Sequence, residues 1–208
     1  TERSGTTSRR DNELSRRLQH DRSYTPLIAV LLSRGRSRRI PGDKAFLEFE
    51  GRPLVLHALD AYTDLPTEPL IVTKHPTRYR GLGVDLLEDR YTEETPISGI
   101  LTAGDHAAVV GAEWVFIAGA DTIPSVPDLY RRLWDERDGA PVDGAVLIEI
   151  AGRVQPFPGL YRRGALSAWR DAYRLGRFKL IPTAEGIPAQ RLAFDSDPYH
   201  NINTIDQL

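Results

Sequence analysis

The 208-residue sequence contains no cysteine, which excludes disulfides, thiolate metal sites and a cysteine nucleophile. It also lacks any apolar run of about 18 residues, so a membrane-spanning helix is not expected. Methionine is absent even at position 1, which we interpret as a processed or trimmed start. The formal net charge of -2 argues against a chain that mainly coats nucleic acid. We therefore expect a cytoplasmic protein with neither a nucleic-acid nor a membrane partner.

Apolar residues make up 40% of the chain and charged residues 27%, the balance of an ordinary globular protein. The first 25 residues differ, since Leu14 and Leu18 are their only aliphatic side chains. So little apolar surface cannot compensate the entropy of folding. We therefore predict a flexible N-terminal tail over residues 1–25 and a single domain over residues 26–208.

From residue 26 onward, apolar runs of strand length alternate with segments of helical length. The runs predict strands at residues 26–32, 69–73, 84–89, 114–120, 144–150 and 191–195. Helices are predicted at residues 50–62, 98–110, 126–138 and 164–173, with a C-terminal one capped by Thr204, whereas residues 152–161 are typical of a loop. Strands that alternate with helices indicate parallel crossover units. We predict a three-layer α/β/α, Rossmann-like fold with a mostly parallel central sheet.

The loop after the first predicted strand combines small residues with cations. Residues 32–44 read LSRGRSRRIPGDK and include two glycines, four arginines and a lysine. Ligands of open α/β sheets bind outside the carboxyl ends of the strands. There glycine lets backbone N–H groups approach phosphate oxygens, and cations neutralise their charge. The loop matches neither GxxxxGK[ST] nor GxGxxG, so composition alone leaves both a phosphate-binding loop and a solvated basic loop open.

Candidate metal and substrate ligands follow several of the apolar runs. Asp121 stands at the end of one run, and its carboxylate oxygens suit Mg²⁺, which often takes one or two carboxylates plus substrate phosphates and waters. Asp89 stands at the end of another run. The alternatives are a helix N-cap at Asp121 and a solvated turn at Asp89. Asn201 and Asn203 alternate as on a strand, which places both side chains on one face. Turn capping is the alternative for these two asparagines.

The segment 32–44 resembles LAGGxSxRMGxDK, the signature of the molybdenum cofactor guanylyltransferases (MobA) and of the wider nucleotidyltransferase superfamily. The matching positions are Leu32, Gly35, Ser37, Arg39, Asp43 and Lys44, and Gly42 stands at a variable position of the signature. Further similar segments follow in the family's order: AFLEFEGRPLV from residue 45, TPISGI from residue 95, AGAD ending at Asp121, QPFPGLYRR from residue 155 and NINTIDQL at the C-terminus. The similarity therefore extends over residues 26–208.

The resemblance implies a magnesium-dependent transfer of GMP from GTP to the molybdenum–molybdopterin cofactor, with release of pyrophosphate. It implies catalytic roles for Lys44, Arg39 and Asp121, with Mg²⁺ held by Asp121. The residues it implies for nucleotide binding are Leu32, Ser33, Arg34, Gly35, Ser37, Lys44, Asp89 and Asp121. Those implied for binding the acceptor are Gly99, Asn201 and Asn203.

The implied partners are GTP and the molybdopterin cofactor as substrates, with molybdoenzymes or cofactor-carrier proteins as protein partners. Two alternatives stay open. One is a nucleotidyltransferase with a different base or acceptor, of the cytidylyl or sugar-phosphate type. The other is a non-catalytic relative that binds a nucleotide or a partner, favoured by Arg34, Pro41 and Thr95, which stand where the family has glycines. Against this last alternative is the joint presence of Lys44, Asp89 and Asp121.

Overall fold

The computed structural model describes residues 26–33 and 43–202. Its main sheet is built from β1 (Leu27–Ser33), β4 (Pro69–Thr73), β5 (Asp85–Glu88), β6 (Trp114–Gly119), β8 (Ala145–Ile150), β9 (Arg153–Arg162) and β10 (Ala189–Phe194). Two short pairs lie outside it: β2 (Glu48–Phe49) with β3 (Arg52–Pro53), and β7 (Thr122–Pro124) with β11 (Tyr199–Asn201). The α-helices are α2 (Leu54–Asp60), α3 (Pro96–Val110), α4 (Leu129–Asp135), α5 (Leu166–Arg174) and α6 (Leu180–Glu185).

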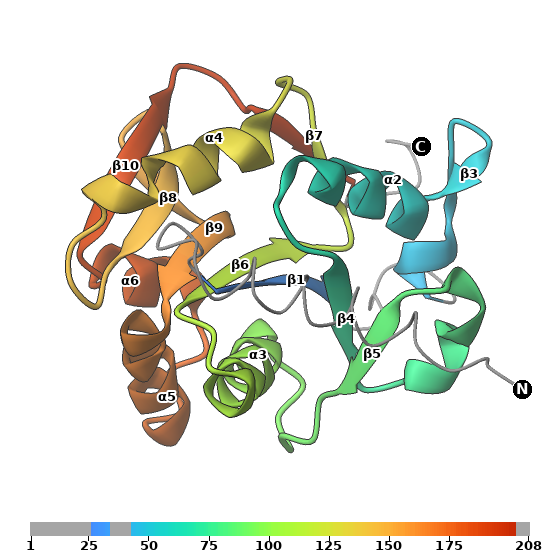
Figure 1. The fold of residues 1–208 in the computed structure, drawn as a ribbon, viewed down its shortest axis with the longest axis horizontal. Helices are drawn as coiled ribbons and strands as arrows, with labels where there is room; N and C mark the ends of the chain where they lie inside the picture. Colours follow the sequence, from blue (N-terminus) through green and yellow to red (C-terminus); the bar gives the residue numbers. More distant parts are fainter. Residues whose placement is uncertain (1–25, 34–42, 203–208) are drawn as a thin grey trace, which may run out of the picture.

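The seven-stranded sheet has the order β10-β8-β9-β6-β1-β4-β5 and carries helices on both faces (Figure 1). Every neighbouring pair is parallel except the two that involve β9, which runs antiparallel to β6 and to β8. Helices α2 and α4 cover one face, and α3, α5 and α6 cover the other. The predicted three-layer α/β/α fold with a mostly parallel sheet is confirmed.

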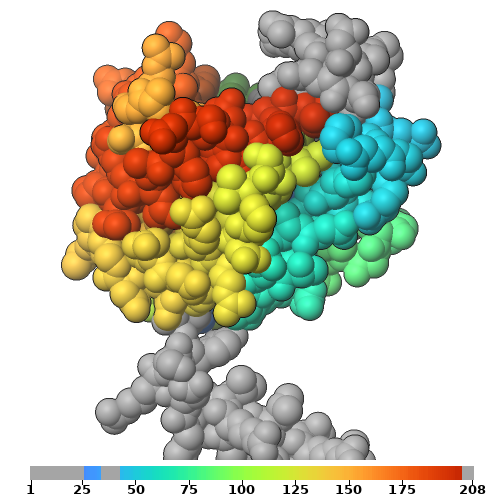
Figure 2. All heavy atoms as spheres, turned by 90° about the horizontal axis from the view of Figure 1, so that it is seen from above, coloured from blue at the N-terminus to red at the C-terminus, as the bar shows by residue number. Residues whose placement is uncertain are grey.

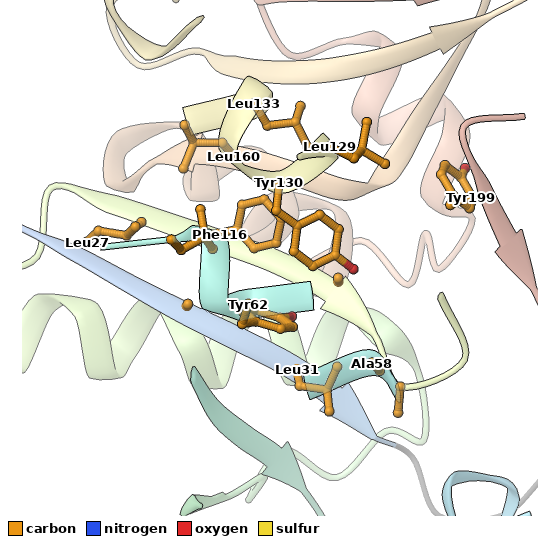
Figure 3. Packing of buried hydrophobic residues seen from close by; sticks show 14 of the residues in the cluster. Leu27, Leu31, Ala58, Tyr62, Phe116, Leu129, Tyr130, Leu133, Leu160 and Tyr199 are labelled. Atoms are coloured by element: carbon orange, nitrogen blue, oxygen red, sulfur yellow. The ribbon is translucent and has the colours of Figure 1, made fainter. Parts of the chain in front are cut away.

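Strand β1 is buried because its residues alternate between two hydrophobic cores. Leu31 belongs to the core beneath α2 and α4, and Val30 to the core beneath α3, α5 and α6. In the first core Tyr62, Phe116 and Tyr130 form an aromatic cluster with ring centroids 4.6 to 5.6 Å apart (Figure 3). A parallel strand covered on both faces needs apolar side chains on both, which explains the unbroken apolar run in its sequence.

Strand β9 corrects one prediction, because residues 152–161 were expected to form a loop. They form most of an antiparallel strand between β8 and β6. The register against β8 shifts between Leu147 and Ile148, and Pro156 and Pro158 lie among the residues skipped there. Proline cannot donate to a strand ladder and is accommodated at such irregularities. Because these prolines break the alternating pattern, the sequence alone did not indicate the strand.

Other predictions concern residues outside the described part of the chain. These are the tail at residues 1–25, most of the basic loop, and the helix capped by Thr204. Within residues 26–33 and 43–202, no helix is long and apolar enough to cross a membrane.

Candidate active site

The carboxyl ends of β1, β4 and β6 lie at one edge of the sheet, because β1 runs parallel to both neighbours. Ser33, the last residue of β1, pairs in register with Thr73, the last residue of β4. Beyond β6, the N–H of Ala120 donates to the carbonyl of Leu32 at 3.0 Å. This hydrogen bond brings the start of the basic loop beside Asp121. The edge is where ligands bind in open α/β sheets.

Lys44 reaches this edge from the far end of the same loop. Its Nζ donates to Oδ2 of Asp121 at 2.7 Å, and the two side chains are 17% and 36% exposed. Both groups therefore stay within reach of a ligand from solvent. The helix N-cap alternative for Asp121 is wrong, since β7 follows it directly and α4 begins only at Leu129.

Gly119 leaves room for the Asp121 carboxylate. A Cβ at this position would lie 2.6 Å from Oδ1 of Asp121 and 3.2 Å from Oγ1 of Thr122. The first distance is shorter than any ordinary contact, so any other residue here would displace the carboxylate. Our sequence analysis missed this role, although a glycine inside an apolar strand is a recognised sign of close approach.

Asn201 lies on strand β11, beside the residue that follows Asp121. It pairs with Thr122 of β7, whose Oγ1 donates to the Asn201 Oδ1 at 3.1 Å. The following N–H, of Ile202, donates to the carbonyl of Asp121 at 3.0 Å. In Figure 2 the red segment near the C-terminus, which includes β11, lies beside the yellow-green segment that includes β7. The expectation that Asn201 lies on a strand is confirmed, and the structure brings it to Asp121.

A cavity of about 660 Å³ opens beside Asn201. Its lining includes Phe49 of β2, Gln155 of β9, and Tyr199 and His200 of β11. Burial raises the pKa of Tyr199 to about 12, so its hydroxyl is protonated at neutral pH. Asp197 also lines the cavity, which therefore offers hydrogen-bonding groups, one carboxylate and aromatic side chains. The sequence did not identify it, because its lining comes from three distant strands.

Asp89 lies in an internal hydrogen-bond network. Its side chain is 7% exposed, and Oδ1 accepts from the N–H of Tyr91 at 3.1 Å and from Oγ1 of Thr102 at 3.0 Å. Nζ of Lys74 lies 3.6 Å from Oδ2. The solvated-turn alternative is wrong, because this carboxylate orders the connection between β5 and α3. Its contact with a nucleotide stays a prediction.

Gly99 is buried in α3 where the helix crosses the sheet. A Cβ there would lie 2.9 Å from Cδ2 of Leu32 and 3.7 Å from Cγ1 of Val72. The glycine therefore lets α3 approach β1 and β4 closely, and its acceptor contact stays a prediction.

The other predicted site residues lie outside the described part of the chain. They are Arg34, Gly35, Ser37, Arg39 and Asn203, and their roles stay predictions. Within the described ranges, no three or more His, Cys, Asp and Glu side chains form a metal-binding group. A cation held here by protein carboxylates would depend on one side chain and on oxygens of the substrate.

Most of the chain, including this site, matches a known domain family. The model of the MobA-like NTP transferase domain matches residues 29–183. The molybdenum cofactor guanylyltransferase of Cereibacter sphaeroides is 34% identical over 190 residues, which cover 88% of this chain and 93% of that relative. The enzyme of the same name from Acidiphilium cryptum is 32% identical over 194 residues, with coverages of 88% and 93%.

The fold comparison agrees with the sequence comparison. The crystal structure of molybdopterin-guanine dinucleotide biosynthesis protein A from Archaeoglobus fulgidus matches with a TM-score of 0.67 at 23% identity, covering 86% of this chain and 93% of that one. The family model spans most of the sheet, from residue 29 in β1 through β9, and the edge that holds Lys44 and Asp121. This chain is therefore a nucleotidyltransferase of the MobA-like NTP transferase family.

Proposed function

We propose that this protein transfers GMP from GTP to the molybdenum–molybdopterin cofactor and releases pyrophosphate. The names of the curated relatives support this reaction, at 32% and 34% identity over most of both chains. The structural observation that carries the proposal is the contact between Lys44 and Asp121 at the carboxyl edge of the sheet. It supplies one positive and one negative group where a metal-bound triphosphate needs both.

The reaction needs positioning and charge neutralisation more than a base. A phosphate oxygen of the acceptor attacks the α-phosphorus of GTP, and the bond from that phosphorus to the pyrophosphate breaks. The acceptor phosphate is already anionic near neutral pH, so no strong general base is required. Lys44 holds oxygens of the triphosphate, and its charge offsets the negative charge that develops on the leaving group.

Membership of a nucleotidyltransferase family implies a divalent cation, and we propose Mg²⁺ held by Asp121. The residues fit this ion, because Asp121 offers a hard oxygen ligand that is 36% exposed and for which Gly119 keeps space. One carboxylate together with phosphate oxygens and waters is an ordinary Mg²⁺ environment. When bound, the ion polarises the α-phosphoryl group and stabilises the leaving pyrophosphate.

The contact between Lys44 and Asp121 links the binding of the metal ion to the binding of the triphosphate. Without ligands, the ammonium and the carboxylate neutralise each other at 2.7 Å. With the metal and the triphosphate bound, Asp121 would hold the cation and Lys44 would hold phosphate oxygens. Neither charge is left without a counter-charge, which avoids the cost of an isolated, partly buried ion. Binding of GTP and of the cation is therefore cooperative.

We assign the acceptor to the cavity beside Asn201. Its hydrogen-bonding lining and its proximity to Asp121 support this assignment. We also keep Gly99 and Asn203 as proposed contacts of the acceptor, although Gly99 packs against Leu32 and Val72 and is not part of this lining. Molybdoenzymes or cofactor carriers are the protein partners that the proposed product requires.

Calorimetric titration tests the nucleotide part of the proposal. The wild type is titrated with GTP, CTP, ATP and UTP in Mg²⁺, beside Asp121→Asn and the control Asp60→Asn. Asp60 is a matched carboxylate, paired with Arg52 at 2.9 Å on the surface. We expect GTP to bind best, with weaker binding in Asp121→Asn or in the presence of chelator but not in Asp60→Asn. Preference for another base would indicate a different transferase, and no binding at all would indicate a non-catalytic relative.

A further inference from the structure

Tyr79 connects the two described residues that flank residues 34–42. It lies between the short 3-10 helices η3 (Pro76–Arg78) and η4 (Arg80–Leu82), and its side chain is fully buried. Its hydroxyl oxygen lies 2.6 Å from Oγ of Ser33 and 2.9 Å from Oδ2 of Asp43. Three segments that are distant in sequence therefore meet at one hydroxyl group.

The chemistry of these groups fixes the direction of both hydrogen bonds. A carboxylate can only accept, so Tyr79 donates to Asp43 and Ser33 donates to the Tyr79 oxygen. Burial raises the pKa of the Tyr79 hydroxyl, which keeps the donor proton in place at neutral pH. NH1 of Arg78 lies 3.5 Å from Oδ2 of Asp43 and offsets its charge, since the Asp43 side chain is only 8% exposed.

Asp43 also fixes the short helix that begins at Lys44. Its Oδ1 accepts from the N–H of Ala45 at 3.2 Å and so caps the 3-10 helix η1 (Lys44–Phe46). At the other end of η1, the ring of Phe46 packs against the ring of Tyr79 with centroids 5.1 Å apart. Tyr79 therefore holds η1 at both ends, with Lys44 as its first residue.

Other buried tyrosine hydroxyls in the described part of the chain bond differently. Tyr62 donates to the carbonyl of Val30 at 2.7 Å, and Tyr161 donates to the carbonyl of Pro156 at 2.6 Å. Both of these bonds join a hydroxyl to the backbone. The Tyr79 hydroxyl instead bridges two side chains, both of which adjoin residues of the nucleotide loop.

We propose that Tyr79 is a positioning residue of the nucleotide site. Its hydroxyl holds Ser33 at the end of β1 and Asp43 before η1 in one arrangement, and thereby directs Lys44 to the triphosphate. Tyr79 acts through Ser33 and Asp43, and the identity of the nucleotide rests on the function proposed above.

Steady-state kinetics test the proposal with Tyr79→Phe and the control Tyr161→Phe. Both changes keep a buried ring and remove one hydroxyl. In Tyr79→Phe we expect the KM for GTP to rise about tenfold, the effect of one hydrogen bond to a charged group, with the KM for the acceptor unchanged. In Tyr161→Phe both KM values stay at the wild-type level. A fall in kcat alone, with both KM values unchanged, would indicate a loss of folded enzyme only and would overturn the proposal.

Amide hydrogen exchange without nucleotide provides a second, independent measurement. In Tyr79→Phe the N–H of Ala45 should exchange at least about threefold faster, because its carboxylate acceptor is no longer held. In Tyr161→Phe this exchange should match the wild type. If the wild type fails to use GTP, the proposed function fails, and the exchange measurement still decides the role of Tyr79. Unchanged exchange at Ala45 in Tyr79→Phe would overturn it.

Discussion

Replacement of Asp121 by asparagine separates the chemical role of its charge from its structural role. Asparagine keeps the size of the side chain and an oxygen that can accept from Lys44, but it removes the negative charge. The side chain is 36% exposed, so solvent screens the ion pair, and we expect the free energy of unfolding to fall by only about 1 kcal/mol. Breaking a fully buried pair would cost roughly 3–5 kcal/mol.

The effect of Asp121→Asn on catalysis should be much larger than its effect on stability. Without the carboxylate, the proposed cation loses its protein ligand, and the charge that develops on the phosphates is poorly stabilised. Loss of one preorganised electrostatic group typically lowers kcat by about 10²–10³-fold. Activity should therefore nearly disappear in a protein that is still folded at room temperature.

Two measurements test this prediction. Urea denaturation gives the free energy of unfolding, and pyrophosphate release at saturating GTP and acceptor gives kcat. Asp60→Asn, which removes an exposed carboxylate from a surface ion pair, should leave both quantities near the wild-type values. Wild-type kcat in Asp121→Asn would refute the assignment of Asp121, and a stability loss above about 3 kcal/mol would refute the screening estimate.

Three further changes test the site and the core. Gly119→Ala places a Cβ 2.6 Å from Oδ1 of Asp121 and should lower kcat in the pyrophosphate assay at least about tenfold; an unchanged kcat would show that the carboxylate adapts freely. Phe116→Ala removes the centre of an aromatic cluster and should cost roughly 3–5 kcal/mol in urea denaturation; a loss below about 1 kcal/mol would contradict the packing described above. Burial raises the pKa of Tyr199 to about 12, and it also raises the pKa values of Tyr62, Tyr79, Tyr130 and Tyr161. These pKa values in the folded protein exceed the value of about 10 in the unfolded chain. The buried, protonated tyrosines therefore contribute their full stabilisation below pH ~10. Above pH ~10 the free energy of unfolding falls, up to pH ~12 for Tyr199, by up to about 1.4 kcal/mol per pH unit for each tyrosine. The absorbance of these five tyrosines at the tyrosinate band should rise together with the loss of folded structure seen by circular dichroism. Ionisation of all five near pH ~10 in protein that is still folded would contradict this prediction.

The elements that the sequence predicted correctly are those whose pattern is local. Strands β1, β4 and β6 are short apolar runs, since a sheet covered on both faces demands apolar side chains on both. Helix α3 begins with Pro96, and Gly111, which has a positive φ, caps its C-terminus. Strand β9 escaped prediction because its place between β6 and β8 depends on partners elsewhere in the chain, while its prolines disturb its own pattern.

The sequence indicated individual residues of the candidate site, but not which of them contact one another. The rule that ligands bind at the carboxyl ends of strands pointed to Asp121, with a helix N-cap as the alternative, whereas Ser33 was implied only by the resemblance to the family. The contact of Asp121 with Lys44 spans 77 residues, and that of Tyr79 with Asp43 spans 36. Such contacts depend on the order of strands in the sheet and on the path of the chain between them, and neither is encoded in a short motif.

The surroundings of Asp121 indicate that its carboxylate is in position before any substrate arrives. Gly119 leaves it room, Lys44 holds one oxygen at 2.7 Å, and the N–H of Ile202 holds the carbonyl of the same residue at 3.0 Å. These three constraints come from β6, from η1 and from the end of β11. A group fixed in this way needs little reorganisation when charge develops on a bound phosphate, and this is the condition under which an electrostatic contact contributes most to catalysis. Tyr79 extends the same principle to Lys44, because it fixes η1 through Asp43 at one end and Phe46 at the other.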